Sequence, residues 1–142
     1  MADLKIVQDF IAKTFPALPM QITAVGDKTA EVIYQVGDHS LRPGGTINGP
    51  TMMMVADVAL YIAIQGTVGI TPMAVTSSLN FNFLKRPKAG ADLIGICKLL
   101  KVGRSLAVGE VTIFSEGQSE PVCHATGTYA LPSKAGKVNL QG

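Results

Sequence analysis

The sequence predicts an α+β fold in which consecutive antiparallel strands pack against one buried helix. One segment, residues 49–65, is almost wholly apolar and has the length of a helix. The segments that follow it have strand-like patterns, and short turn sequences separate them. Because strands joined by hairpin turns run antiparallel, a doubly wound parallel sheet is excluded.

The composition indicates a single folded domain and excludes several other classes of protein. The 142 residues are 47% hydrophobic and 15% charged, against about 25% charged residues in a typical soluble domain. Intrinsic disorder, a collagen-like fibre and a highly charged nucleic-acid-binding tail are therefore excluded. We expect one domain over residues 1–142, with an N-terminal helix within residues 1–19 and a flexible tail over residues 132–142.

The first part of the chain predicts a helix followed by a hairpin. Apolar residues recur at helical spacing over residues 4–15, and prolines follow at positions 16 and 19. Short strands are expected at residues 21–25 and 29–35, with a Gly-Asp-Lys turn between them. A loop rich in glycine and proline then occupies residues 37–49.

The central helix is predicted over residues 49–65. Asn48 or Gly49 suits the N-cap, Pro50 suits the first turn, and Gly66 suits the C-terminal cap. We expect this helix to be buried, because it has no polar stripe. A membrane span is the competing interpretation, but the best apolar run, residues 52–64, holds 13 residues and a span needs about 20.

Four strands are predicted after this helix, at residues 73–83, 91–102, 105–115 and 121–131. In the first, alternation places Leu79 and Phe81 on one face and Thr76 and Ser78 on the other. In the last two, small residues at alternate positions let another backbone approach closely, and the central helix is the natural candidate. These small residues are Ala107, Gly109, Cys123, Ala125 and Gly127.

Asp57 is the only charged residue between Pro43 and Leu84, a stretch of 42 residues. It lies well inside the central helix, too far from the N-terminus to cap it, and its neighbours one turn away are apolar. An unpaired buried carboxylate is costly in free energy. Asp57 is therefore expected to have a chemical role, to pair with a basic group or to face solvent.

Two further features are consistent with a catalytic site. The loop before the central helix is rich in glycine, and the Gly49 amide at the start of the helix can donate to an oxyanion or carbonyl oxygen. Six basic residues lie between positions 85 and 104, against one acidic residue, Asp92. They would attract substrate phosphates, although a solvated hairpin edge explains them equally well. The six are Lys85, Arg86, Lys88, Lys98, Lys101 and Arg104.

No metal site, cofactor site or nucleic-acid-binding surface is predicted. His39 and His124 are far apart, Cys97 and Cys123 lack the spacing of a zinc site, and phosphate-loop and dinucleotide fingerprints are missing. The strands also lack an aromatic-rich platform for nucleic acids. No signal peptide is evident, so we expect a cytoplasmic protein with reduced cysteines and no membrane partner.

Three short motifs occur in a distinctive order along the chain. Gly45-Thr46-Ile47-Asn48-Gly49 precedes Asp57, and the run from Val75 to Leu84 precedes Pro87. Gly103-Arg104-Ser105-Leu106 follows. Together these motifs resemble the hotdog-fold acyl-CoA thioesterases of the phenylacetate-degradation type, and the resemblance covers residues 20–131.

This resemblance implies a fold and a site. The fold is an antiparallel sheet wrapped around a long central helix, assembled as a homodimer or as a tetramer made of two such dimers, with active sites at the interface. Asp57 would act as nucleophile or as general base on water, and the Gly49 amide would polarise the thioester carbonyl. Asn48 would orient the substrate, and Thr76 would position the attacking water from the other subunit. No metal or redox cofactor is required.

The same resemblance implies an acyl-CoA substrate with contacts of two kinds. Basic side chains would hold the phosphates, and side chains of the central helix would shape the acyl pocket. The expected substrate contacts are Arg42, Met53, Tyr61, Lys85, Arg86 and Arg104.

The chain differs from the usual family pattern at two positions. Asn48-Gly49-Pro50 stands where the family has His-Gly-Gly, and Arg42 stands where it has Asn. Asn48 can donate a hydrogen bond but cannot titrate. Two alternatives therefore stay open: a hotdog dimer that binds an acyl thioester or another apolar ligand without hydrolysing it, and a hotdog hydratase that uses His39.

Overall fold

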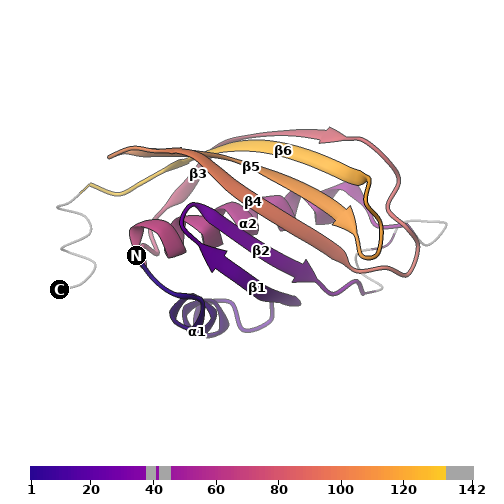
Figure 1. Cartoon of the computed structure of the whole chain (residues 1–142), viewed down its shortest axis with the longest axis horizontal. Coiled ribbons are helices and arrows are strands. Elements are labelled where there is room, and N and C mark those ends of the chain that lie inside the picture. Colours follow the sequence, from indigo (N-terminus) through magenta and orange to yellow (C-terminus); the bar gives the residue numbers. More distant parts are fainter. Residues whose placement is uncertain (38–40, 42–45, 134–142) are drawn as a thin grey trace.

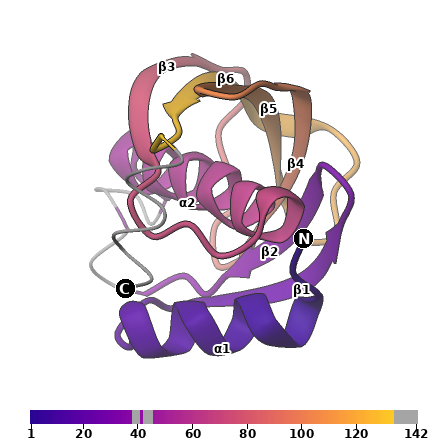
Figure 2. The ribbon, with the colours of Figure 1, turned by 90° about the vertical axis from the view of Figure 1, so that its left-hand side faces the viewer.

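The structure is a computed structural model of the chain and describes residues 1–37, 41 and 46–133. All neighbouring strands are antiparallel and form one sheet in the order β1-β2-β4-β5-β6-β3. The sheet curls around helix α2, and helix α1 lies outside it against β1 (Figures 1 and 2). The elements are α1 (Leu4–Thr14), β1 (Met20–Gly26), β2 (Thr29–Tyr34), α2 (Gly49–Val68), β3 (Val75–Phe83), β4 (Leu93–Val102), β5 (Leu106–Ser115) and β6 (Pro121–Ala130).

The predicted elements are all present, and the main difference in bounds is at the end of α2. This helix continues through Gly66 to Val68, so the predicted C-terminal cap at Gly66 is wrong. Gly66 instead lets β1 come close, because a Cβ there would collide with Val25 Cγ1. The helix ends at Gly69, whose φ of +94° is a conformation that favours glycine.

Helix α2 is buried on the side that faces the sheet and open on the other. Met53, Asp57 and Tyr61 follow one another at one-turn spacing on the open side, and Met53 is 40% exposed. The expectation that the helix is buried on all sides is wrong for this strip, because the sheet covers only part of its circumference. By length and composition α2 could cross a membrane, but 61% of its most apolar window is buried inside the fold.

Two paired glycines of the sheet let helix α2 pack closely against it. Gly109 and Gly127 pair across β5 and β6, and Leu60 of α2 packs on both. A Cβ on Gly109 would lie 2.8 Å from both Leu60 Cδ2 and Leu99 Cδ2, and one on Gly127 would lie 2.6 Å from Leu60 Cδ1. The close approach predicted from the small residues is therefore confirmed.

A β-bulge in β3 changes which of its residues face α2. Thr76 pairs with Tyr129 of β6, and the next pair is Ser78 with Thr128, so one extra residue lies between them. Strict alternation predicted Thr76 on the same face as Ser78, which is wrong. The bulge turns Thr76 toward the helix, whereas Ser78 remains exposed on the other face.

Replacing Gly109 by alanine tests the close packing of Leu60 on β5. The added methyl group would have to displace two buried leucine side chains, so we expect the free energy of unfolding to fall by about 1 to 3 kcal/mol. Urea unfolding measures the change. Thr126→Ala, on the exposed face of β6, is the control and should change the midpoint little. An unchanged or higher midpoint for Gly109→Ala would show that Leu60 does not rest on this strand.

Candidate functional site

Asp57 is held by two hydroxyl groups that come from two strands. Thr76 Oγ1 of β3 donates to Asp57 Oδ1 at 2.7 Å, and the Tyr129 hydroxyl of β6 donates to the same oxygen at 2.6 Å. The Tyr129 hydroxyl also lies 3.0 Å from the main-chain oxygen of Asp57. Among the described residues nothing hydrogen-bonds to Oδ2. The arrangement therefore fixes one carboxylate oxygen and leaves the other without a hydrogen bond among the described residues.

Tyr129 is the residue of this site that the sequence reasoning missed. The stripe of small residues at 123, 125 and 127 continues by one more period to position 129, so strand alternation could have placed this side chain toward the helix. Burial raises the pKa of Tyr129 above its ordinary value, and the hydrogen bond to Asp57 raises it further. The phenol consequently stays protonated at neutral pH and acts as a donor.

Thr76 reaches Asp57 of its own chain. The family resemblance implied that this hydroxyl would approach from the other subunit and position water. The bulge in β3 instead directs it onto the carboxylate within one chain. Its observed contact is with the carboxylate itself.

A small pocket opens beside this carboxylate. We call it the Asp57 pocket; its volume is about 190 Å³. Tyr61, one of the two α2 residues predicted to contact the acyl group, is in its lining, and the other, Met53, is not. The lining residues are Phe15, Leu18, Asp57, Val58, Tyr61 and Tyr129.

Asn48 and Gly49 form the start of α2. Asn48 Oδ1 accepts hydrogen bonds from Thr51 N at 2.8 Å and Thr51 Oγ1 at 2.7 Å, so this side chain is the N-cap. Gly49 is the first residue of the helix, where backbone N–H groups have no acceptor within the helix. Its amide is therefore suited to donate to a substrate oxygen.

A second pocket, here the Gly49 pocket, lies at this helix start and has a volume of about 320 Å³. Lys85 and Arg86 contribute to it, so two of the predicted phosphate contacts lie beside the Gly49 amide. Its lining residues are Thr46, Ile47, Gly49, Met52, Phe83, Lys85, Arg86 and Pro87.

The two halves of the predicted site are separate within one chain. Gly49 and Asp57 are eight positions apart on α2, which corresponds to about 12 Å along a helix. The Asp57 pocket and the Gly49 pocket have no lining residue in common. One chain therefore holds a carboxylate centre and an amide-and-cation centre, but not both in one cavity.

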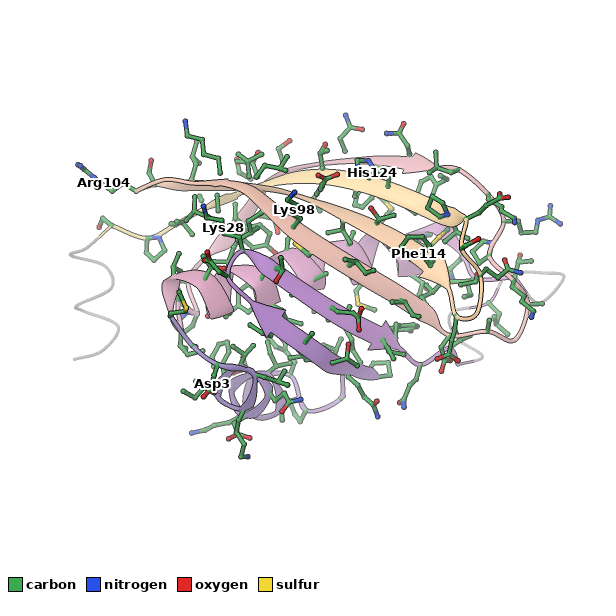
Figure 3. The ribbon with its side chains drawn as sticks, viewed as in Figure 1. Asp3, Lys28, Lys98, Arg104, Phe114 and His124 are labelled. Carbon is green, nitrogen blue, oxygen red and sulfur yellow. The ribbon has the colours of Figure 1, made fainter. Side chains whose placement is uncertain are left out.

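The predicted basic cluster is split between the two ends of the sheet. Arg104 lies in the β4–β5 hairpin, at the opposite end of the molecule from the segment that follows β3 (Figure 3). Strand β4 spans ten residues between these ends, or about 33 Å. The expectation of one cluster is therefore wrong within a single chain. Arg42, another predicted contact, and His39 lie outside the described residues.

Nothing in the described part of the chain forms a metal site. Within residues 1–37, 41 and 46–133, no group of three or more His, Cys, Asp and Glu side chains is placed to hold an ion. His124 Nε2 instead lies 2.8 Å from Glu110 Oε1. Cys97 and Cys123 are free and buried; burial raises the pKa of both, and that of Cys97 to about 12. The thiols are thus poor nucleophiles at neutral pH.

Comparison with known proteins agrees with this geometry. Residues 44–122 match the profile of the thioesterase superfamily. A putative thioesterase from Silicibacter sp. TM1040 is 36% identical, with 92% of each chain covered and a TM-score of 0.85. The chain belongs to the thioesterase superfamily. No match is found among curated proteins.

Other solved structures agree with a thioesterase of the PaaI type and with the hotdog fold, as the sequence predicted. A mutant of the phenylacetic acid degradation protein PaaI from Thermus thermophilus is 25% identical, covers 84% of this chain and 99% of its own, and has a TM-score of 0.72. A Streptococcus mutans protein with bound acetyl CoA shares the fold at 23% identity, a TM-score of 0.70 and coverage of 81% and 90%.

Replacing Asn48 by alanine tests its role as the N-cap of α2. Loss of the cap should lower the free energy of unfolding by about 1 kcal/mol. Asn48→Asp keeps an oxygen acceptor for the Thr51 amide and should restore most of the loss. Urea unfolding of the three proteins measures both effects. Equal midpoints for the alanine variant and the unmodified chain would mean that the cap contributes nothing.

Proposed function

We propose that this thioesterase hydrolyses acyl-CoA thioesters to a free acid and CoA, with Asp57 as the catalytic carboxylate. The observation that carries the proposal is the way Asp57 is held: its Oδ1 accepts two hydroxyl groups, and its Oδ2 is left for reaction beside a pocket. Membership of the superfamily supports thioester hydrolysis in general. The acetyl CoA bound by the Streptococcus mutans protein supports a CoA thioester.

The proposed reaction uses the free oxygen of Asp57. As general base, Oδ2 takes a proton from water while the water oxygen attacks the thioester carbonyl carbon. The C–S bond then breaks, and CoA leaves as a thiolate that takes up the proton. As nucleophile, Oδ2 attacks the carbonyl carbon directly, the C–S bond breaks and CoA leaves as a thiolate. Water then hydrolyses the mixed anhydride, which releases the free acid, restores the Asp57 carboxylate and supplies the proton that the thiolate takes up. In both routes Thr76 and Tyr129 fix the carboxylate through Oδ1.

The oxyanion site is proposed to come from a second copy of the chain. Gly49 and Asp57 lie in separate pockets about 12 Å apart along α2, so one chain cannot present both to the same carbonyl group. In a homodimer, Gly49 of one protomer can face Asp57 of the other. Strand β3 is at the edge of the sheet, where one side of its backbone is open to pairing. A tetramer of two such dimers is compatible with this arrangement.

The positions of the basic side chains indicate which residues contact the CoA part of the substrate. We propose that Lys85 and Arg86 hold CoA phosphates, because they line the pocket that also contains Gly49. Asn48 keeps its amide nitrogen as a donor while its oxygen caps α2. Arg104, at the other end of the sheet, has no place in this site unless the other protomer supplies it.

The two free thiols support a cytoplasmic location.

A protein that binds acyl-CoA without hydrolysing it is the second candidate. One observation favours it: Asn48 stands where the family has His, and its oxygen is engaged in the helix cap. Calorimetry that shows tight acyl-CoA binding, together with no thiol release across a chain-length and aryl panel, would select this candidate. A hydratase would need a histidine; the described residues that line the two pockets include none, and His39 lies outside the described residues.

Replacing Asp57 by asparagine tests the catalytic carboxylate. Asparagine has nearly the same shape and can still accept the two hydroxyl groups, so the fold should persist. We expect kcat on the best acyl-CoA to fall by about a hundredfold or more, the scale of losing a general base. Release of CoA thiol is the measurement, and the buried cysteines of the protein should contribute little to the signal.

The matched control for this variant is Asp9→Asn. Asp9 is an exposed carboxylate on α1 that pairs only with Lys5, so its loss should leave kcat unchanged. If Asp57→Asn folds and keeps most of its activity, the role assigned to Asp57 is wrong.

Replacing Tyr129 by phenylalanine tests how the carboxylate is held. The ring stays, but one hydrogen bond to Oδ1 is lost, so we expect kcat to fall by about tenfold, a change of the size expected for hydrogen bonds to charged groups. Tyr34→Phe, which removes a buried hydroxyl of β2 away from this pocket, should leave kcat unchanged. An unchanged kcat in Tyr129→Phe would remove Tyr129 from the mechanism.

A further inference from the structure

We propose that the Asp57 pocket binds the acyl group and selects a compact, uncharged, apolar one, with Phe15 and Leu18 setting its length. The inference rests on the proposed function, since it takes Asp57 as the point where the thioester carbonyl lies. It goes further by assigning a substrate class and by giving the N-terminal segment a part in selectivity.

The outer wall of the pocket is the turn between α1 and β1. Phe15 is the C-cap residue of α1, and its N–H donates to Ile11 O at 2.8 Å. Leu18 N then donates to Phe15 O at 3.1 Å, and prolines at positions 16 and 19 restrict the backbone further. The two side chains are thus presented by an ordered turn, which suits a wall of fixed position.

Three of the six described residues that line the pocket are aromatic. Tyr61 is at the centre, with its ring centroid 6.1 Å from that of Phe15 and 6.2 Å from that of Tyr129. Both phenol hydroxyls are already engaged: Tyr61 donates to Pro72 O at 3.0 Å, and Tyr129 donates to Asp57. The tyrosines therefore offer ring surface rather than hydrogen bonds to a ligand, which favours an apolar acyl group.

The volume of the pocket sets the size of the group. It is about 190 Å³, and a protein cavity of about 150 Å³ lined by apolar side chains is known to hold benzene. An acyl group of about six or seven carbon atoms therefore fills the pocket. A longer chain meets the side chains of Phe15 and Leu18.

The charge of the pocket excludes dicarboxylic acyl groups. Asp57 is the only charged residue among the six described residues that line it. A second carboxylate at the far end of the acyl chain would be desolvated against aromatic rings and close to Asp57, and the described lining supplies no cation for it. Succinyl-CoA should therefore be a poor substrate compared with an uncharged acyl-CoA of similar length.

The two wall residues lie outside the part of the chain that matches the superfamily profile. Phe15 and Leu18 precede residues 44–122, which carry that match. Selectivity set by this turn can consequently differ between proteins that share the same catalytic core.

The test compares kcat/KM for straight-chain acyl-CoAs of increasing length in the full chain and its variants. Phe15→Ala and Leu18→Ala open the wall and should raise the ratio of decanoyl-CoA to hexanoyl-CoA by at least tenfold, because each methylene group in an apolar pocket changes kcat/KM by about that factor or more. Phe15→Trp narrows the pocket and should lower the same ratio. Succinyl-CoA should be hydrolysed at least a hundredfold less efficiently than butyryl-CoA.

The control variant is Ile6→Ala, which shortens an exposed apolar side chain of α1 outside the pocket and should leave the ratio unchanged. Thermal unfolding of each variant shows whether α1 has detached, and Phe15→Trp retains a large aromatic ring that keeps the contact with Tyr61. Ratios that do not move in opposite directions for the alanine and tryptophan variants overturn the proposal, as does equal hydrolysis of succinyl-CoA and butyryl-CoA.

A failure of the proposed function gives a different result. If the unmodified chain releases no thiol from any acyl-CoA, hydrolysis is wrong, and calorimetric Kd values for hexanoyl-CoA and decanoyl-CoA then test the pocket alone. A Kd ratio that changes by tenfold in Phe15→Ala supports the pocket, and an unchanged ratio overturns it.

Discussion

The contact between Leu60 and the paired glycines of β5 and β6 is the constraint on which the rest of the structure depends. It brings α2 so close to the sheet that no Cβ fits at Gly109 or Gly127 without displacing a leucine. Asp57 lies one turn before Leu60, and Tyr129 lies one strand period after Gly127. The same close approach therefore puts the Tyr129 hydroxyl 2.6 Å from Asp57 Oδ1. The packing that buries the core therefore also sets the positions of the residues around Asp57.

The carboxylate is stabilised by neutral donors, and this decides what it can do. A basic partner would form an ion pair with Asp57, whereas two hydroxyl groups satisfy one carboxylate oxygen and, among the described residues, leave the other without a hydrogen bond. Donors from β3 and β6 meet at this oxygen only because the β3 bulge turns Thr76 inward. A strand irregularity is thereby built into the site, as bulges near active sites often are.

The order of the elements, their approximate bounds and the position of Asp57 within an apolar helix could all be predicted from the sequence. The prediction that Gly66 ends the helix is wrong. Glycine often follows the last residue of a helix, but here it is needed inside the helix because the Val25 side chain packs against it. Thr76 was placed on the wrong face, because alternation holds only until a bulge interrupts it. The basic residues are close in sequence but do not form one cluster, because the extended ten-residue strand β4 separates its two ends in space.

By itself the sequence determined the features that depend on local pattern: the apolar helix, the alternating strands, the small-residue stripe and the single charge within 42 residues. Only the tertiary structure decided which groups meet at that charge, because Thr76 and Tyr129 are 19 and 72 positions away from it. It also showed that Gly49 and Asp57 of one chain occupy different pockets. Contacts between distant residues follow from strand register and helix packing, which no single segment encodes.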